Sequence, residues 1–264
     1  MRLSVLTLFP DLIRQVIGSS ITGRALEKGI FSLDVIQIRD FAVNDYGKAD
    51  DYCYGGGTGM LMMAQPILDA WLHAVKLNHQ DAPEADAASV IAWREKHRQD
   101  CRTFYLSPRG DVYSQSMASE LSQYEHLIFL CGHYEGVDQR VLDLVTDAEL
   151  SIGDYVLTGG ELGACVVIDG LLRMVPGVLP NSEAYGRESH MNQLLEHAQY
   201  TRPAVWQNIN VPDVLLSGHQ ARIDAWKHRQ SLYETARRRP DLLQRRHTTS
   251  DEWQGLLENW PEKQ

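Results

Sequence analysis

Glycine-rich segments are the part of this 264-residue chain whose composition points most directly to ligand binding. The segment 151–173, SIGDYVLTGGELGACVVIDGLLR, holds four glycines ahead of an apolar run at 164–168. Glycine adopts positive φ angles and lets a backbone approach a ligand closely. Two further clusters lie upstream, at 131–140 (CGHYEGVDQR) and 54–63 (YGGGTGMLMM). We therefore expect the three clusters to fold together around one small ligand.

Cysteines and histidines show no metal-ligand pattern along the sequence. The four cysteines, Cys53, Cys101, Cys131 and Cys165, are far apart and form no CxxC pair. The ten histidines lack ligand spacing such as the i, i+4 pair of HExxH. Separated thiols in a chain of this size are typical of the reducing cytosol. The sequence thus predicts no metal site and a cytoplasmic location.

Several functional classes are excluded by absent patterns. The sequence has no GxxxxGK[ST], so it is not a P-loop hydrolase. No GxGxxG follows its first predicted strand, which excludes a Rossmann dinucleotide enzyme. It has no apolar run of about 18 residues or more, so no membrane span is expected.

Charge is unevenly distributed over the chain. The net charge is −10, yet residues 200–250 hold nine Lys or Arg against four Asp or Glu. A basic segment on an acidic protein favours nucleic-acid binding through one surface. A solvated helix face is the alternative from charge alone.

Strands and helices alternate in the first part of the chain. Apolar runs predict strands at 3–9, 31–38, 102–107 and 127–131, and helical spacing predicts helices between them. This alternation indicates an α/β fold with a mostly parallel sheet. The glycine clusters follow predicted strand ends, where such sheets bind ligands.

Composition also predicts the domain organisation. The polar segment 78–101 is predicted to be a peripheral insertion. Residues 176–191 are rich in Pro, Gly, Ser and Asn, which indicates a boundary. Beyond them, a long helix is predicted to start at Ser217 or Gly218 and to stop at Pro240.

Taken together, the motifs resemble the TrmD family of bacterial tRNA (guanine-N1)-methyltransferases. The resemblance runs nearly end to end through LTLFPDL, TGRA, IRDF, DDYCYGGGTGMLMMAQP, YLSPRG, CGHYEGVDQR, SIGDYVLTGGEL, IDGLLR, VPGVL, YTRP and VPDVLLSG. One glycine motif would be weak evidence, but this many motifs in the same order are specific.

The resemblance implies a fold, a cofactor and partners. It implies a SPOUT-type α/β domain with a trefoil-knotted parallel sheet over 1–179, a linker over 180–192 and a small helical tRNA-binding domain over 193–264. It further implies an obligate homodimer with the active site at the subunit interface. The cofactor would be S-adenosylmethionine, with Mg2+ as an assisting ion. The substrate would be guanine 37 of tRNA, beside the anticodon.

By the same resemblance, three loops would wrap the cofactor. Backbone groups would read the adenine edge while glycines let the chain come near. The residues so implied are Tyr105, Leu106, Ser107, Pro108, Gly132, Tyr134, Gly136, Ser151, Ile152, Gly153, Tyr155, Leu157, Gly159 and Gly160.

Methylation at guanine N1 requires removal of a proton, and a carboxylate is the natural base. In the family an Asp of the linker is the base, and an Arg stabilises the charge that moves onto guanine O6. The resemblance assigns these two roles here to Glu188 and Arg173. Glu188 is one methylene longer than Asp, so a solvated linker carboxylate is the alternative, and Glu183 is a second candidate base.

Four further residues are implied to contact the substrate. Glu135 would accept hydrogen bonds from the guanine edge, with a turn carboxylate as the alternative. Asp50 would contact guanine or tRNA, Arg24 would be an active-site or phosphate cation, and His190 would stack on the base. The alternatives for Asp50 and Arg24 are a solvated loop and a surface salt bridge.

The chain departs from the family pattern mainly near the substrate. Tyr52-Cys53, Thr58, His133 and Gly163 replace the usual residues, and most of 78–101 is absent from the family. These departures leave two alternatives to guanine-N1 methylation of tRNA. One is a TrmD-like paralogue with a changed RNA target, and the other is a non-catalytic cofactor- or RNA-binding protein.

Overall fold

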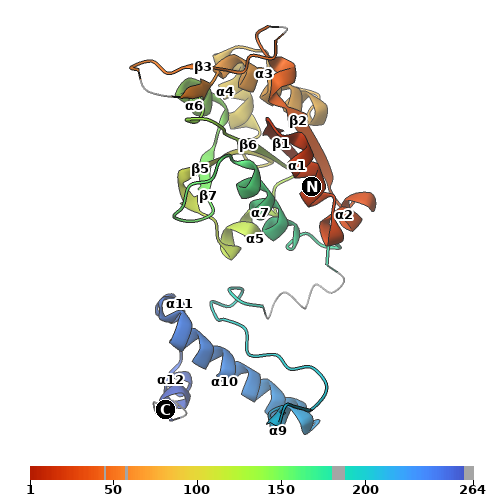
Figure 1. Ribbon diagram of the computed structural model, residues 1–264, viewed down its shortest axis with the longest axis vertical. Helices are drawn as coiled ribbons and strands as arrows, with labels where there is room; N and C mark the ends of the chain where they lie inside the picture. The colour runs from red at the N-terminus through yellow and green to blue at the C-terminus, as the bar shows by residue number, and fades with distance from the viewer. Residues whose placement is uncertain (45, 57–58, 180–187, 259–264) are drawn as a thin grey trace. The chain divides into compact units, whose positions relative to one another are not determined.

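The computed structural model describes residues 1–44, 46–56, 59–179 and 188–258. The chain divides into two compact units, residues 1–180 and 181–264, which Figure 1 shows as a sheet-containing part and a helical part. The two units are described separately below.

A five-stranded parallel sheet forms the centre of the first unit, in the order β2-β1-β6-β5-β7. Parallel neighbours cannot be joined by tight turns and need longer crossover connections. The predicted α/β class with a parallel sheet is therefore confirmed. The strands are β1 (Arg2–Thr7), β2 (Ser32–Gln37), β5 (Cys101–Val112), β6 (His126–Cys131) and β7 (Ala148–Ser151).

Alternating side chains of the central strands supply a core on both faces of the sheet. Leu3 and Val5 of β1 belong to one buried cluster, whereas Leu6 belongs to the other. Phe129 and Ile128 of β6 divide in the same way, as the period of two along a strand requires. Burial on both faces explains why these strands are continuous apolar runs in the sequence.

Helices cover both faces of this sheet and complete the two clusters (Figure 1). The face that carries Leu6 packs against α3 (Ala64–Asn78), α4 (Ala87–Lys96) and α6 (Gln139–Val145). The opposite face packs against α1 (Pro10–Ile17), α2 (Ser20–Glu27), α5 (Gln115–Leu121) and α7 (Glu161–Leu172). The 3-10 turn η1 (Ile38–Phe41) and the antiparallel hairpin of β3 (Asp50–Tyr52) and β4 (Met60–Met62) lie between β2 and α3 in sequence.

The segment 78–101 is less peripheral than its composition predicts. Val90 and Trp93 of α4 are 0% and 5% exposed and belong to the core. Arg94 donates hydrogen bonds to the carbonyls of Leu144 and Thr146, at 2.7 and 2.6 Å. The prediction of a peripheral insertion is thus corrected for one face of α4, because two apolar side chains spaced i, i+3 suffice to dock a mostly polar helix.

The second unit is mainly helical. It contains α9 (Asp213–Leu216), α10 (Gln220–Arg238), α11 (Pro240–Arg245), α12 (Ser250–Glu258) and a hairpin of β8 (Val205–Trp206) with β9 (Ile209–Asn210). Leu194, Leu232, Leu243 and Leu256 form its small apolar core. Within the part of the chain that the structure describes, no helix has the length and apolar composition that a membrane span needs.

Candidate functional site

A cavity of about 440 Å³ lies where β5, β6 and β7 end their pairing in the sheet. Its walls come from three stretches of chain, within 105–109, 132–142 and 150–163. The volume falls within the roughly 300–1,000 Å³ that is typical of small-molecule sites. The carboxyl ends of parallel strands are also where α/β sheets bind their ligands.

Every residue predicted to contact the cofactor lines this cavity. The structure thus brings together side chains and glycines that are up to 55 positions apart, and it does so at one place. Their individual roles toward the cofactor stay predictions. The lining includes Tyr105, Leu106, Ser107, Pro108, Gly132, Tyr134, Gly136, Ser151, Ile152, Gly153, Tyr155, Leu157, Gly159 and Gly160.

Two glycines of the wall leave no room for a side chain. A Cβ atom at Gly132 would lie 2.7 Å from the hydroxyl oxygen of Tyr105, and one at Gly160 would lie 2.8 Å from the Cα of Cys131. Both distances are shorter than a van der Waals contact. The Gly160 amide donates to the Gly132 carbonyl at 2.9 Å. Glycine is required at Gly160 because the two loops meet backbone to backbone, and at Gly132 because the ring of Tyr105 packs against it.

The third glycine cluster, 54–63, contacts the second cluster but does not line the cavity. None of its described residues lines the cavity. The Met62 amide donates to the Gly136 carbonyl, and the Glu135 amide donates to the Met60 carbonyl, both at 3.0 Å. The described residues of 54–63 thus pack against the second cluster without lining the cavity, unlike the prediction that all three clusters close on one ligand. The stretch 105–109 within β5, where the pairing with β7 shifts register, forms the third wall.

A buried carboxylate that the sequence interpretation missed ties the cavity wall together. Oε1 of Glu161 accepts a 2.6 Å hydrogen bond from the Thr7 hydroxyl, and Oε2 lies 2.8 Å from Nε2 of His133. Glu161 is only 3% exposed. It joins the end of β1, the loop after β6 and the first turn of α7. An acid directly before the apolar run 162–168 was the signal that could have identified it.

The polar side chains at the cavity differ in exposure and charge. Tyr105 is buried, and burial together with the Glu149 carboxylate raises the pKa of its phenol. The phenol is therefore protonated at neutral pH and can donate a hydrogen bond. Glu135 lies exposed on the cavity wall. Arg109 pairs with Glu149 at 2.7 Å.

Two of the predicted substrate residues lie away from the cavity. Asp50 begins β3, where it is half-buried and pairs with Met62 across the hairpin. Arg24 is exposed in the last turn of α2 and, with Lys28, lines a separate hollow of about 180 Å³. Neither residue lines the 440 Å³ cavity of this unit.

The predicted base and cation belong to different units. Arg173 caps the carboxyl end of α7 in the first unit. Glu188 and His190 belong to the second unit, where His190 has a φ of 73° and its amide donates to the Leu194 carbonyl at 2.8 Å. Glu183 lies outside the described residues. The pairing of Glu188 with Arg173 therefore stays a prediction.

Comparison with known proteins places the chain in a family. A family model described as tRNA (Guanine-1)-methyltransferase TrmD matches residues 1–245, which extends through the first unit into the second. The chain belongs to this family. The resemblance inferred from the sequence motifs is confirmed.

Relatives named tRNA (guanine-N(1)-)-methyltransferase match this chain over nearly its whole length. The relative from Shouchella clausii (strain KSM-K16) is 49% identical over 252 residues, which cover 96% of this chain and 95% of that protein. The relative from Ruminiclostridium cellulolyticum is 47% identical over 243 residues, covering 92% and 96%. That from Clostridioides difficile (strain 630) is 44% identical over 245 residues, covering 93% and 98%.

Proposed function

We propose that this chain transfers a methyl group from S-adenosylmethionine to N1 of guanine in tRNA, at position 37 beside the anticodon. The observation that carries the proposal is the coincidence of the predicted cofactor residues in one cavity of a TrmD-family chain. Relatives over nearly the full length carry the name of this activity.

The cavity suits S-adenosylmethionine in size and in the character of its walls. Leu106, Ile152 and Leu157 offer apolar surface to an adenine ring, and glycine backbone lies beside them. Backbone donors and acceptors fix a nucleoside without the entropy cost of ordering long side chains. When bound, the cofactor supplies an electrophilic methyl group on a sulfonium ion.

The chain's own residues would handle the proton and the charge on guanine. We assign the removal of the N1 proton to the carboxylate of Glu188 and the stabilisation of charge on O6 to Arg173. Glu135, exposed on the cavity wall, is assigned to the donors of the guanine edge. Asp50, Arg24 and His190 are assigned to the remaining substrate contacts.

A homodimer would bring these residues together across a subunit interface. Exposed apolar side chains on the neighbouring helices α1 and α7 support this assembly, namely Val16 with Leu162 and Val166, together with Phe9 just before α1. Several exposed apolar side chains on neighbouring elements are typical of protein interfaces. The trefoil knot, the tRNA-binding role of the helical unit, assistance by Mg2+ and a cytoplasmic location complete the proposal.

A methylation assay on unmodified tRNA transcripts tests the proposed function. Purified protein is incubated with labelled S-adenosylmethionine and transcripts that carry G or A beside the anticodon, and the product nucleosides are analysed. We expect N1-methylguanine only with the G transcript. Glu188→Ala and Arg173→Ala should abolish methylation while the cofactor still binds in calorimetry.

The same assay separates the alternatives left by the departures from the family pattern. Turnover on total RNA without new N1-methylguanine would indicate a changed RNA target. Cofactor binding with no turnover on any RNA would indicate a non-catalytic protein. Absence of cofactor binding would refute the proposed cavity.

A further inference from the structure

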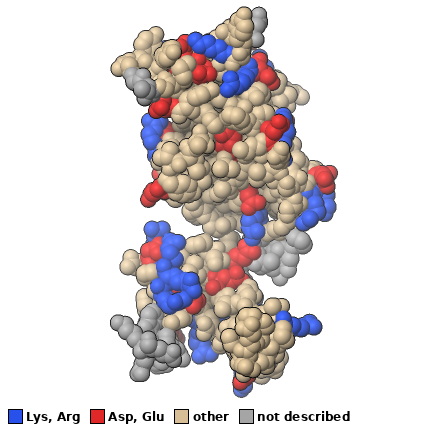
Figure 2. All heavy atoms as spheres, viewed as in Figure 1, with Lys and Arg blue, Asp and Glu red and all other residues tan. Residues whose placement is uncertain are grey.

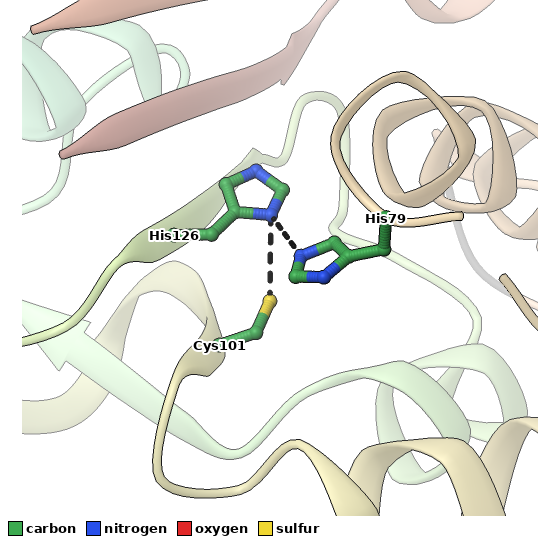
Figure 3. A group of neighbouring side chains, drawn as sticks. All are labelled: His79, Cys101 and His126. Carbon is green, nitrogen blue, oxygen red and sulfur yellow. Dashed lines mark hydrogen bonds between the residues drawn. The ribbon is translucent and has the colours of Figure 1, made fainter. Parts of the chain in front are cut away.

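Three metal-ligand side chains converge at the amino edge of the sheet, as Figure 3 shows. His79 directly follows α3 and caps its carboxyl end, Cys101 opens β5 and His126 opens β6. Nε2 of His79 lies 3.0 Å from Nδ1 of His126, and Sγ of Cys101 lies 3.5 Å from the same nitrogen. The sequence could not predict this cluster, because its members are far apart along the chain.

Two of the three separations between the donor atoms are close to those of a tetrahedral zinc site, and the third is within 4.8 Å. Zn–N bonds of about 2.05 Å and Zn–S bonds of about 2.3 Å at tetrahedral angles place N and N about 3.3 Å apart, and S and N about 3.6 Å apart. The observed 3.0 and 3.5 Å are within about 0.3 Å of these values. An ion could therefore enter with small movements of the side chains.

The surroundings hold the donors in place. His126 and Ser4 are fully buried, and the Ser4 hydroxyl oxygen lies 2.9 Å from Nε2 of His126. With Nε2 of His126 as the donor in this bond, Nδ1 presents its lone pair to the cluster. A second ring nitrogen held by an outer partner is the usual arrangement of a metal-binding histidine. The ring of Trp93 packs edge-on against His79 at 5.1 Å and shields it.

We propose that His79, Cys101 and His126 bind a transition-metal ion of the zinc type. A thiolate with two imidazoles selects borderline-soft ions such as Zn2+ and Co2+ over Mg2+ and Ca2+. Three protein ligands leave the fourth tetrahedral position for a water molecule.

The position of the site indicates a structural role. His79 and Cys101 lie at the two ends of the inserted segment 78–101, and His126 anchors them to the middle of the sheet. An ion bound by these three residues would close the insertion as a loop and stabilise the folded chain by its binding free energy. The cofactor cavity lies past the opposite ends of the same strands.

Binding of the metal ion would release one proton, which comes from the Cys101 thiol. Cys101 is buried, and burial favours the neutral thiol, so the thiol carries its proton before the ion enters. Burial likewise favours the neutral imidazole of His126. The Zn–S bond forms as the S–H bond breaks, and the proton leaves to solvent. In His79 the ring proton moves from Nε2 to Nδ1.

A neighbouring set is a weaker candidate for the same ion. Asp81 and His97 also lie near His79. Asp81 is already engaged by Lys96 at 2.5 Å and by His97 at 2.9 Å, and its carboxylate is 43% exposed. Ion pairing accounts for this group without a metal. His97 therefore serves as a control and not as a ligand.

Titration of the chelator-treated full chain with Co2+ tests the proposal. We expect one equivalent to give tetrahedral d–d bands and a thiolate-to-cobalt charge-transfer band, and Zn2+ to displace it. Zn2+ should also raise the midpoint of thermal unfolding relative to chelator. Cys101→Ser should remove the charge-transfer band, and His79→Gln should weaken binding at least tenfold. Ser4→Ala should keep the band and weaken binding about 10- to 100-fold.

Matched variants decide the ligand assignment. Cys53→Ser changes a half-buried thiol elsewhere in the unit and should leave the band and the affinity unchanged. His97→Gln should also retain the band. No stoichiometric band with the unmodified chain, a band lost with Cys53→Ser or a band lost with His97→Gln would overturn the proposal. Methylation is not needed for any of these readings, so they are independent of the proposed enzyme activity.

Discussion

At the scale of single residues, Glu161 connects the wall of the proposed cofactor cavity to the core of the sheet. Its two oxygens meet the Thr7 hydroxyl and Nε2 of His133 at 2.6 and 2.8 Å. His133 itself lines the cavity. A carboxylate with 3% exposure persists only where its oxygens have such partners. We therefore expect Glu161 to contribute mainly to the stability of the fold, and to ligand binding through His133.

Replacing this carboxylate should lower both stability and cofactor affinity. Glu161→Ala would leave the Thr7 hydroxyl and His133 without this partner, at a cost of about 1–3 kcal/mol in unfolding free energy. Denaturant titration measures that cost, and calorimetry with S-adenosylmethionine measures the affinity. Glu95→Ala, whose side chain is 76% exposed, should change stability by no more than about 0.5 kcal/mol. Equal effects of the two substitutions would show that the buried network has no special role.

Close packing of Gly132 against the side chain of Tyr105 gives a second residue-scale prediction. Gly132→Ala would push a methyl group against the ring and hydroxyl of Tyr105, so it should cost about 1–3 kcal/mol and weaken cofactor binding at least tenfold. Gly255→Ala is the matched control, since an added Cβ meets nothing within 4 Å in α12. That change should stabilise the chain by about 0.5–1 kcal/mol. Unchanged cofactor affinity in Gly132→Ala would contradict the close packing.

The residues that line the cavity were named through the family resemblance, and glycine chemistry gives a physical reason for part of that set. Glycine marks backbone that must turn sharply or pack tightly, and this requirement is visible in sequence at Gly132 and Gly160. Glycine content alone could not distinguish the lining loops from the 54–63 cluster. That cluster is also rich in glycine, but its described residues contact the lining loop 133–136 without lining the cavity. Glu161 was missed because its partners, Thr7 and His133, are distant in the chain.

At the scale of elements, α4 shows how few apolar residues are needed to dock a helix. Most of its residues are exposed or half-buried, which is why the surrounding segment was predicted to be peripheral. Trp93 nonetheless packs edge-on against Trp71 at 5.7 Å and stacks on His97 at 4.4 Å. Composition averages over the faces of a helix, so a narrow apolar stripe is easily lost in it. The continuous apolar strands, by contrast, were predicted to within a few residues.

The docking of α4 predicts an asymmetric response to truncation of its side chains. Trp93→Ala should cost about 3–5 kcal/mol of unfolding free energy, as expected for loss of a buried aromatic ring. Ile91→Ala in the same helix removes a side chain that is 57% exposed, so it should cost less than about 1 kcal/mol. Thermal or denaturant unfolding of both variants measures the difference. A small cost for Trp93→Ala would restore the view that the insertion is detached from the core.

At the scale of the whole molecule, the uneven distribution of charge bears on RNA binding. Figure 2 shows Lys and Arg gathered over the end of α10 and over α11. Several of these cations are already paired inside the helical unit: Arg237 and Arg238 with Glu234, and Arg239 with Asp241. Such pairs bring little net charge to a polyanion. Exposed cations earlier in α10, Arg222 and Arg229, are better placed to meet phosphates.

Salt dependence of tRNA binding tests this division of the basic residues. Each phosphate contact adds a nearly fixed increment to the slope of log affinity against log salt, because binding releases counterions. Arg229→Ala should therefore reduce that slope by about 1 and weaken binding similarly for all tRNA sequences. Lys76→Ala removes an exposed cation from α3 in the first unit and should leave the slope unchanged. If both variants kept the original slope, the proposed phosphate contact of Arg229 would be refuted, and the basic composition of 200–250 would reflect a solvated helix face.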